Sequence, residues 1–117
     1  MQNNRAVGTK YEQLAKEYLS AHGYEIVESN YYCKKGELDL IAKESGYLVF
    51  IEVKYRKNEK NGSGFDAVHM GKQKKMKQSA LFYLMERHLS LEQPMRFDVV
   101  SVDDKEIKVI QNAFDYY

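Results

Sequence analysis

The sequence predicts a single α/β domain over residues 1–117, a sandwich in which helices flank a central sheet of mixed strand pairing. Three observations predict this class. A chain of 117 residues is long enough for one domain with its own core and leaves little for a second. Hydrophobic residues make up 44% of the chain and charged residues 30%, which argues against disordered and membrane-spanning proteins. Helix-like and strand-like patterns follow the order α-β-β-β-α-β-β.

A first helix is expected from about Thr9 to His22. Apolar residues recur there at helical spacing and form a single stripe that consists of Tyr11, Leu14, Ala15, Tyr18 and Leu19. Thr9 fits an N-cap with Glu12 three residues later, as in a capping box, and Gly23 fits a helix stop.

Three strands are expected next, over Tyr24–Cys33, Glu37–Glu44 and Tyr47–Arg56. The first should bend near Asn30. The second alternates charged and apolar residues, and the third is rich in β-branched and aromatic residues. Ser45–Gly46 suits a two-residue hairpin loop, because glycine tolerates a positive φ. The last two strands therefore form a hairpin with a fixed register.

The second half of the chain begins with a loop over Lys57–Phe65. A long basic helix then runs from Asp66 or Gly71 to His88, with an inner face that consists of Met76, Ala80, Tyr83 and Leu84. Two strands, Arg96–Val102 and Glu106–Ile110, complete the expected order.

The hairpin register places four charged residues together. Asp39 lies directly opposite Glu52, and Glu37 lies opposite Lys54, with Cβ atoms about 4.5–5.5 Å apart. The other face would be apolar and would pair Leu38 with Val53, Leu40 with Ile51 and Ala42 with Val49. The hairpin is thus expected to have one apolar face and one charged face.

Two carboxylates at this spacing raise each other's pKa unless a cation lies between them. Mg²⁺ or Mn²⁺ is the natural occupant for Asp39 and Glu52, since these ions take oxygen ligands and keep several waters. Lys54 would reach a bound water or a phosphate oxygen from the same face. This pattern indicates metal-assisted hydrolysis of a phosphodiester. The alternative is a charged outer surface with an ordinary Glu37–Lys54 ion pair.

Positive charge is concentrated in residues 54–77, which carry eight basic and two acidic side chains. No acid occurs from Gly71 to Met85, although a solvated helix usually interleaves acids with its lysines. The segment predicts a nucleic-acid-binding surface that consists of Arg56, Lys57, Lys72, Lys74 and Lys75. The alternative is a solvated, lysine-rich helix.

At these residues the chain resembles a known family. Residues 36–41 (GELDLI) and 50–56 (FIEVKYR) resemble the YraN family of small bacterial proteins, which looks like a distant relative of archaeal Holliday-junction resolvases in the PD-(D/E)XK nuclease superfamily. The likeness covers nearly the whole chain and includes Gly8, Glu12, Ala15, Gly23, Tyr24, Asn30, Lys72, Arg96, Phe97, Asp98, Asn112, Ala113 and Phe114. One departure is Leu38, which stands where the superfamily's nominal motif has a proline.

The resemblance implies a restriction-endonuclease-like (PD-(D/E)XK) core and a role for each matched residue. Asp39 and Glu52 would be metal ligands, with the Val53 carbonyl as a third. Lys54 would orient or activate the attacking water, and Glu12 would be an additional acid beside the metal. For Glu12 the alternative is a helix residue that the dipole favours near the N-terminus.

The resulting expectation is a Mg²⁺- or Mn²⁺-dependent endonuclease that binds branched or otherwise structured DNA, and the resolvase likeness suggests a homodimer. Two rivals stay open: a non-catalytic nucleic-acid-binding module with the same fold, and a protein-interaction module that uses the tyrosine-rich surface. Metal-dependent nicking separates the enzyme from both rivals, and salt-dependent DNA binding separates the two rivals.

The remaining residues indicate no other chemistry. The histidines are scattered, and Cys33 has no second cysteine, which excludes an internal disulfide. Tyr31, Tyr32 and Tyr55 could stack on bases, but packing is the expected role of each. The longest apolar run, Ala80–Met85, is six residues, and the first residues carry no apolar signal stretch. The expected location is the cytoplasm, with no membrane partner.

Overall fold

The computed structural model describes residues 4–55 and 70–115, without the side chains of residues 4–8. Its elements follow the predicted order: α1 (Asn4–Ala21), β1 (Glu25–Cys33), β2 (Gly36–Glu44), β3 (Tyr47–Tyr55), α2 (Met70–Glu86), β4 (Met95–Val102) and β5 (Ile107–Phe114). The five strands form one sheet in the order β1-β2-β3-β4-β5. A mixed α/β fold is therefore confirmed. Neither described helix is long and apolar enough to cross a lipid bilayer.

The sheet is mixed because of one crossover. β3 and β4 run parallel, from Leu48↔Met95 to Tyr55↔Val102, and the connection between them carries α2. The other neighbouring strands pair antiparallel. At the β2–β3 turn, Ser45 and Gly46 both have positive φ, 52° and 84°, as a two-residue hairpin loop of this kind requires. The predicted hairpin loop is confirmed.

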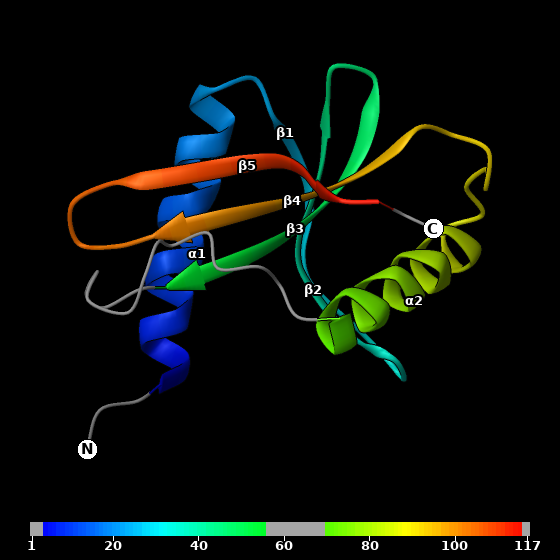
Figure 1. Cartoon of the computed structure of the whole chain (residues 1–117), viewed down its shortest axis with the longest axis horizontal. Helices are drawn as coiled ribbons and strands as arrows, with labels where there is room; N and C mark the ends of the chain where they lie inside the picture. The colour runs from blue at the N-terminus through cyan, green and yellow to red at the C-terminus, as the bar shows by residue number, and fades with distance from the viewer. Residues whose placement is uncertain (1–3, 56–69, 116–117) are drawn as a thin grey trace.

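The two helices lie on different faces of the sheet (Figure 1). Each face has a buried apolar cluster that contains residues of one helix. The cluster with α1 consists of Ala15, Leu19, Tyr24, Leu40, Ala42, Val49, Ile51, Val100 and Val102. The cluster with α2 consists of Tyr31, Leu38, Ile41, Leu48, Phe50, Met76, Ala80, Tyr83, Leu84 and Phe97. The expectation of one apolar and one charged hairpin face is therefore wrong, because a helix covers each face.

Several element boundaries differ from the expectation. α1 begins at Asn4, so Thr9 lies inside the helix and the predicted cap is wrong. Leu14 is 37% exposed, because α1 buries a narrower stripe than the spacing indicates. β5 continues to Phe114 rather than ending at Ile110. The bend expected in β1 is present, since Asn30 has a φ of 55°, which asparagine tolerates better than most residues.

A buried polar network joins the strands at the end of the sheet where β2 and β3 turn. Asp98, which is 0% exposed, accepts hydrogen bonds from the Tyr24 hydroxyl (2.7 Å), Arg96 Nε (2.9 Å) and the Asn112 backbone N–H (2.9 Å). Arg96 also pairs with Glu44 at 2.8 Å. Burial and the bond to Asp98 raise the pKa of Tyr24 to about 12, so the hydroxyl stays a donor. The network ties β2, β4 and β5 together.

We predict that Asp98→Asn lowers the free energy of unfolding by about 3–5 kcal/mol, because it leaves a buried guanidinium without its main counterion. Denaturant unfolding followed by circular dichroism measures the change. Asp115→Asn, the same substitution at an exposed position, should stay within about 0.5 kcal/mol of the wild type. Equal stability of the two variants would contradict a structural role for the network.

Candidate functional site

The candidate site lies where β2 and β3 part. Their ladder has the predicted register from Glu44↔Tyr47 to Leu40↔Ile51 and ends there. Beyond it, Leu38 pairs with Tyr31 of β1 and packs in the α2 cluster, so its expected pairing with Val53 is wrong. Figure 1 shows β2 turning away from β3 in the middle of the molecule. We call this parting point, at Asp39, the strand fork.

At the strand fork, the Asp39 carboxylate replaces the β2 backbone as the hydrogen-bond acceptor for Val53. Its Oδ2 accepts a hydrogen bond of 2.8 Å from the Val53 N–H, which would otherwise face Leu38 across the ladder. The N–H and C=O of a strand residue point to the same neighbouring strand. The Val53 carbonyl therefore also faces the space that β2 leaves open, as it would have to do to be the third metal ligand that the family resemblance implies.

The Asp39 and Glu52 side chains are in contact. Burial, the hydrogen bond with Glu52 and the negative charge of Glu52 together raise the pKa of Asp39 to about 7, although the Val53 N–H and Lys72 act in the opposite direction. The pair was expected from hairpin geometry, but the structure forms it beyond the end of the ladder. Near neutral pH the two carboxyl groups need a shared proton or a nearby cation.

A lysine of α2 supplies positive charge at this pair. Lys72 Nζ lies 3.3 Å from Glu52 Oε2, and the Glu52 side chain is 13% exposed. The sequence assigned Lys72 to nucleic-acid binding, whereas the structure places it at the acidic pair. Lys54 is half-buried and, by strand alternation, shares the Glu52 side of β3, as expected.

A pocket of about 630 Å³ adjoins the strand fork. Its lining comes from α1, β1, β2 and β3 and consists of Thr9, Tyr11, Glu12, Asn30, Tyr32, Glu37, Asp39, Val53 and Tyr55. Glu12 accepts a hydrogen bond of 2.8 Å from the Asn30 amide. Burial raises the pKa of Glu12, and the charges of Asp39 and Glu37 contribute in the same direction. The structure thus brings Glu12 into the same pocket as Asp39.

The residues at the fork fit a hard divalent cation. Asp39, Glu52 and the Val53 carbonyl offer oxygen donors, and the contact between the carboxylates is relieved when a cation shares their charge. Within residues 4–55 and 70–115, no three His, Cys, Asp or Glu side chains gather closely enough to hold an ion by themselves. Water would complete the coordination, which Mg²⁺ accepts readily.

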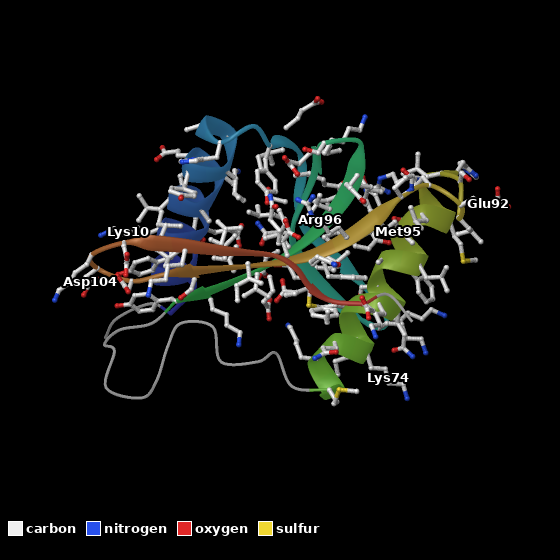
Figure 2. All side chains as sticks on the ribbon, turned by 45° about the horizontal axis from the view of Figure 1, so that its top comes forward. Lys10, Lys74, Glu92, Met95, Arg96 and Asp104 are labelled. Atoms are coloured by element: carbon white, nitrogen blue, oxygen red, sulfur yellow. The ribbon has the colours of Figure 1, made fainter. Side chains whose placement is uncertain are left out.

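The other predicted cationic residues separate into two groups. Arg56 and Lys57 lie outside the described residues. Lys74 and Lys75 are exposed on α2, and Figure 2 shows Lys74 on the flank of this helix. They are accessible to a polyanion, whereas Lys72 is half-buried against Glu52.

Sequence reasoning did not place five of the pocket residues there: Thr9, Tyr11, Asn30, Tyr32 and Tyr55. The signal for Asn30 was its fit to the family pattern and to a bend, and nothing local placed it beside Glu12. Tyr31 is 5% exposed and packs in the core as expected, whereas Tyr32 is 69% exposed. Cys33 is half-buried beside the Ser79 hydroxyl at 3.5 Å, as expected for a structural thiol.

Comparison with known proteins places the chain among small bacterial proteins of one family. Residues 11–102 match the description "Uncharacterised protein family UPF0102". A UPF0102 protein of Lachnoclostridium phytofermentans is 44% identical over 115 residues, which cover 98% of each chain. One of Thermodesulfovibrio yellowstonii is 44% identical over 108 residues, covering 92% of this chain and 95% of the relative. One of Legionella pneumophila is 42% identical over 106 residues, covering 89% and 90%.

The raised pKa of Asp39 predicts a pH-dependent stability. The folded protein holds this proton more tightly than the unfolded chain, so the resulting stability is complete below about pH 4 and is lost as the pH rises through about 7. With a metal chelator present, we compare the free energy of unfolding of the wild type with that of Asp39→Asn at each pH. The difference, wild type minus variant, should fall by on the order of 4 kcal/mol between about pH 4 and about pH 7. Denaturant titrations at a series of pH values measure it. Parallel curves for the two proteins would contradict the prediction.

Proposed function

We propose that this chain, which belongs to the uncharacterised protein family UPF0102 (YraN), is a Mg²⁺- or Mn²⁺-dependent endonuclease that binds structured or branched DNA. A restriction-endonuclease-like core is part of the same proposal. The observation that carries it is the half-buried contact between Asp39 and Glu52 at the strand fork. Such a contact costs stability unless a proton or cation relieves it, and a functional role accounts for keeping it.

The strand fork explains how the fold could present a metal to substrate. Asp39 Oδ2 accepts a hydrogen bond from the Val53 N–H, and the Asp39 side chain also contacts Glu52. The Val53 carbonyl faces the space that β2 leaves open. A metal held there would polarise a phosphate and lower the pKa of the attacking water.

Two lysines can assist the same reaction. Lys54 lies on the Glu52 side of β3, where its ammonium can hydrogen-bond a phosphate oxygen or orient the water. Lys72, which pairs with Glu52, can turn to the phosphate once another cation neutralises the carboxylate. Glu12 can accept a proton from the pocket side, since burial already raises its pKa.

The exposed face of α2 supports binding of a polyanion. Lys74 and Lys75 are exposed and make no ion pair within the part of the chain that the structure describes. The helix carries no acid from Gly71 to Met85 that could pair with them. These lysines lie on the same helix as Lys72, so a strand that follows α2 would reach the strand fork.

A second candidate is a non-catalytic nucleic-acid-binding module. The observation that favours it is the Lys72–Glu52 ion pair at 3.3 Å, which supplies a counter-charge at the site from the protein itself. A protein-interaction module is a further alternative, and neither alternative requires metal-dependent cleavage.

We predict that Asp39→Asn and Glu52→Gln each abolish Mn²⁺ binding and cleavage, because each removes one of two ligand charges. Calorimetric titration with Mn²⁺ and an assay on duplex, single-stranded, flap and four-way DNA measure both effects. Glu17→Gln, an equal charge change at an exposed position of α1, is the control and should match the wild type. Unchanged Mn²⁺ affinity in the two site variants would rule out the proposed metal site.

We also predict that the double variant Lys74→Gln/Lys75→Gln weakens DNA binding at low salt. Each phosphate contact contributes about 0.9 to the slope of log K against log salt on duplex DNA, so the slope should flatten by about 2. Fluorescence anisotropy over a salt series measures it. Lys43→Gln/Lys105→Gln, at exposed positions in β2 and the β4–β5 turn, should leave the slope unchanged. If both double variants have the same slope, Lys74 and Lys75 do not contact DNA phosphates, and α2 is an ordinary solvated helix.

A further inference from the structure

The pocket beside the strand fork combines acids with aromatic rings. Three carboxylates line it, from Glu12, Glu37 and Asp39, and its described lining contains no lysine or arginine. A phosphate is therefore disfavoured inside the pocket itself. A neutral, flat group with hydrogen-bond donors is favoured, because carboxylates accept such bonds and tyrosine rings stack on flat groups.

Aromatic rings lie on both sides of the end of β2. On the β3 side, Tyr11 stacks on Tyr55 with ring centroids 3.8 Å apart and an interplanar angle of 17°. The Tyr11 hydroxyl donates to Asp104 Oδ1 at 3.3 Å, and Figure 2 shows the neighbouring Lys10 at the same end of the molecule as Asp104. This pair is therefore held in place by a contact with the β4–β5 turn.

Tyr32 stands on the β1 side. It pairs in register with Glu37 of β2, lines the pocket and is 69% exposed. Because β2 lies between β1 and β3 in the sheet, Tyr32 and the Tyr11–Tyr55 pair flank the pocket from opposite strands. Asp39 belongs both to this pocket and to the strand fork.

We propose that this pocket binds one unstacked nucleobase, which stacks on Tyr32 while its own phosphate lies at the strand fork. The proposal rests on the proposed function, since the phosphate position comes from the Asp39–Glu52 site. The volume of about 630 Å³ is within the range of pockets for small organic ligands. The Glu12 and Glu37 carboxylates can accept hydrogen bonds from the exocyclic amino groups of a base.

A pocket for one unstacked base would favour substrates that contain unpaired nucleotides. A base in a continuous duplex cannot enter the pocket without leaving its stack, whereas a base in a single strand, flap or junction can do so at lower cost. The protein therefore selects DNA with unpaired nucleotides through stacking, which tolerates any base sequence.

Binding to short single strands tests the inference. Each strand of about ten nucleotides carries 2-aminopurine at one position, and Ca²⁺ replaces Mg²⁺ because it takes the same oxygen ligands. The wild type should change the 2-aminopurine emission. Tyr32→Ala should weaken binding about 5- to 100-fold, as the loss of one base–aromatic stack predicts. Tyr32→Phe keeps the ring and should bind within about twofold of the wild type.

The controls separate this inference from the nuclease proposal. A strand of equal length with abasic sites keeps the phosphates, so it should bind weakly to the wild type and equally weakly to Tyr32→Ala. Equal binding of Tyr32→Ala and Tyr32→Phe to the base-containing strand would overturn the inference, as would full affinity for the abasic strand. The readout is binding, so a protein that never cleaves DNA can still pass or fail this test. Tyr32 is largely exposed, so both variants should fold, and circular dichroism checks this.

Discussion

The hydrogen bond between the Asp39 carboxylate and the Val53 N–H is the interaction on which the site depends. It satisfies a backbone donor that loses its ladder partner when β2 leaves β3. β2 can then continue with β1 beneath α2, while β3 continues with β4. Without this bond, the parting of the strands would leave the part-buried Val53 N–H without its ladder partner. The fork therefore exists because a carboxylate sits at that position, and the same carboxylate is the first candidate ligand.

The electrostatics around the fork are divided between the two sides of the sheet. Carboxylates gather in the pocket between α1 and the strands, and lysines lie along α2. Glu52 lies between these regions and holds Lys72 at 3.3 Å. A nucleotide with its phosphate at the fork would have lysines on one side of it and tyrosine rings on the other. This division is the physical basis for treating the pocket and the helix as parts of one binding surface.

Hairpin register was predictable because it depends on local features. The positive φ values at Ser45 and Gly46 and the alternation of the strands place Leu40 opposite Ile51 without reference to the rest of the chain. The strand fork was not predictable, since it depends on the pairing of β2 with β1 and of β3 with β4, and neither β1 nor β4 belongs to the hairpin. Leu38 is an example. The alternation of side chains along β2 predicts that Leu38 lies on the same face as Leu40, but Leu38 pairs with Tyr31 of β1 and packs in the cluster with α2. Likewise, the run of lysines in α2 does not by itself distinguish Lys72 from Lys74, although only Lys72 of the two fits the family pattern.

Anomalous diffraction from crystals grown with Mn²⁺ tests whether the strand fork holds a metal. We expect one strong peak at the strand fork, about 2.1 Å from oxygens of Asp39, Glu52 and the Val53 carbonyl, with Lys72 moved away from Glu52. Crystals of Asp39→Asn should lack that peak. An empty fork at saturating Mn²⁺, with Lys72 still paired to Glu52, would contradict the account and favour a binding module that needs no metal.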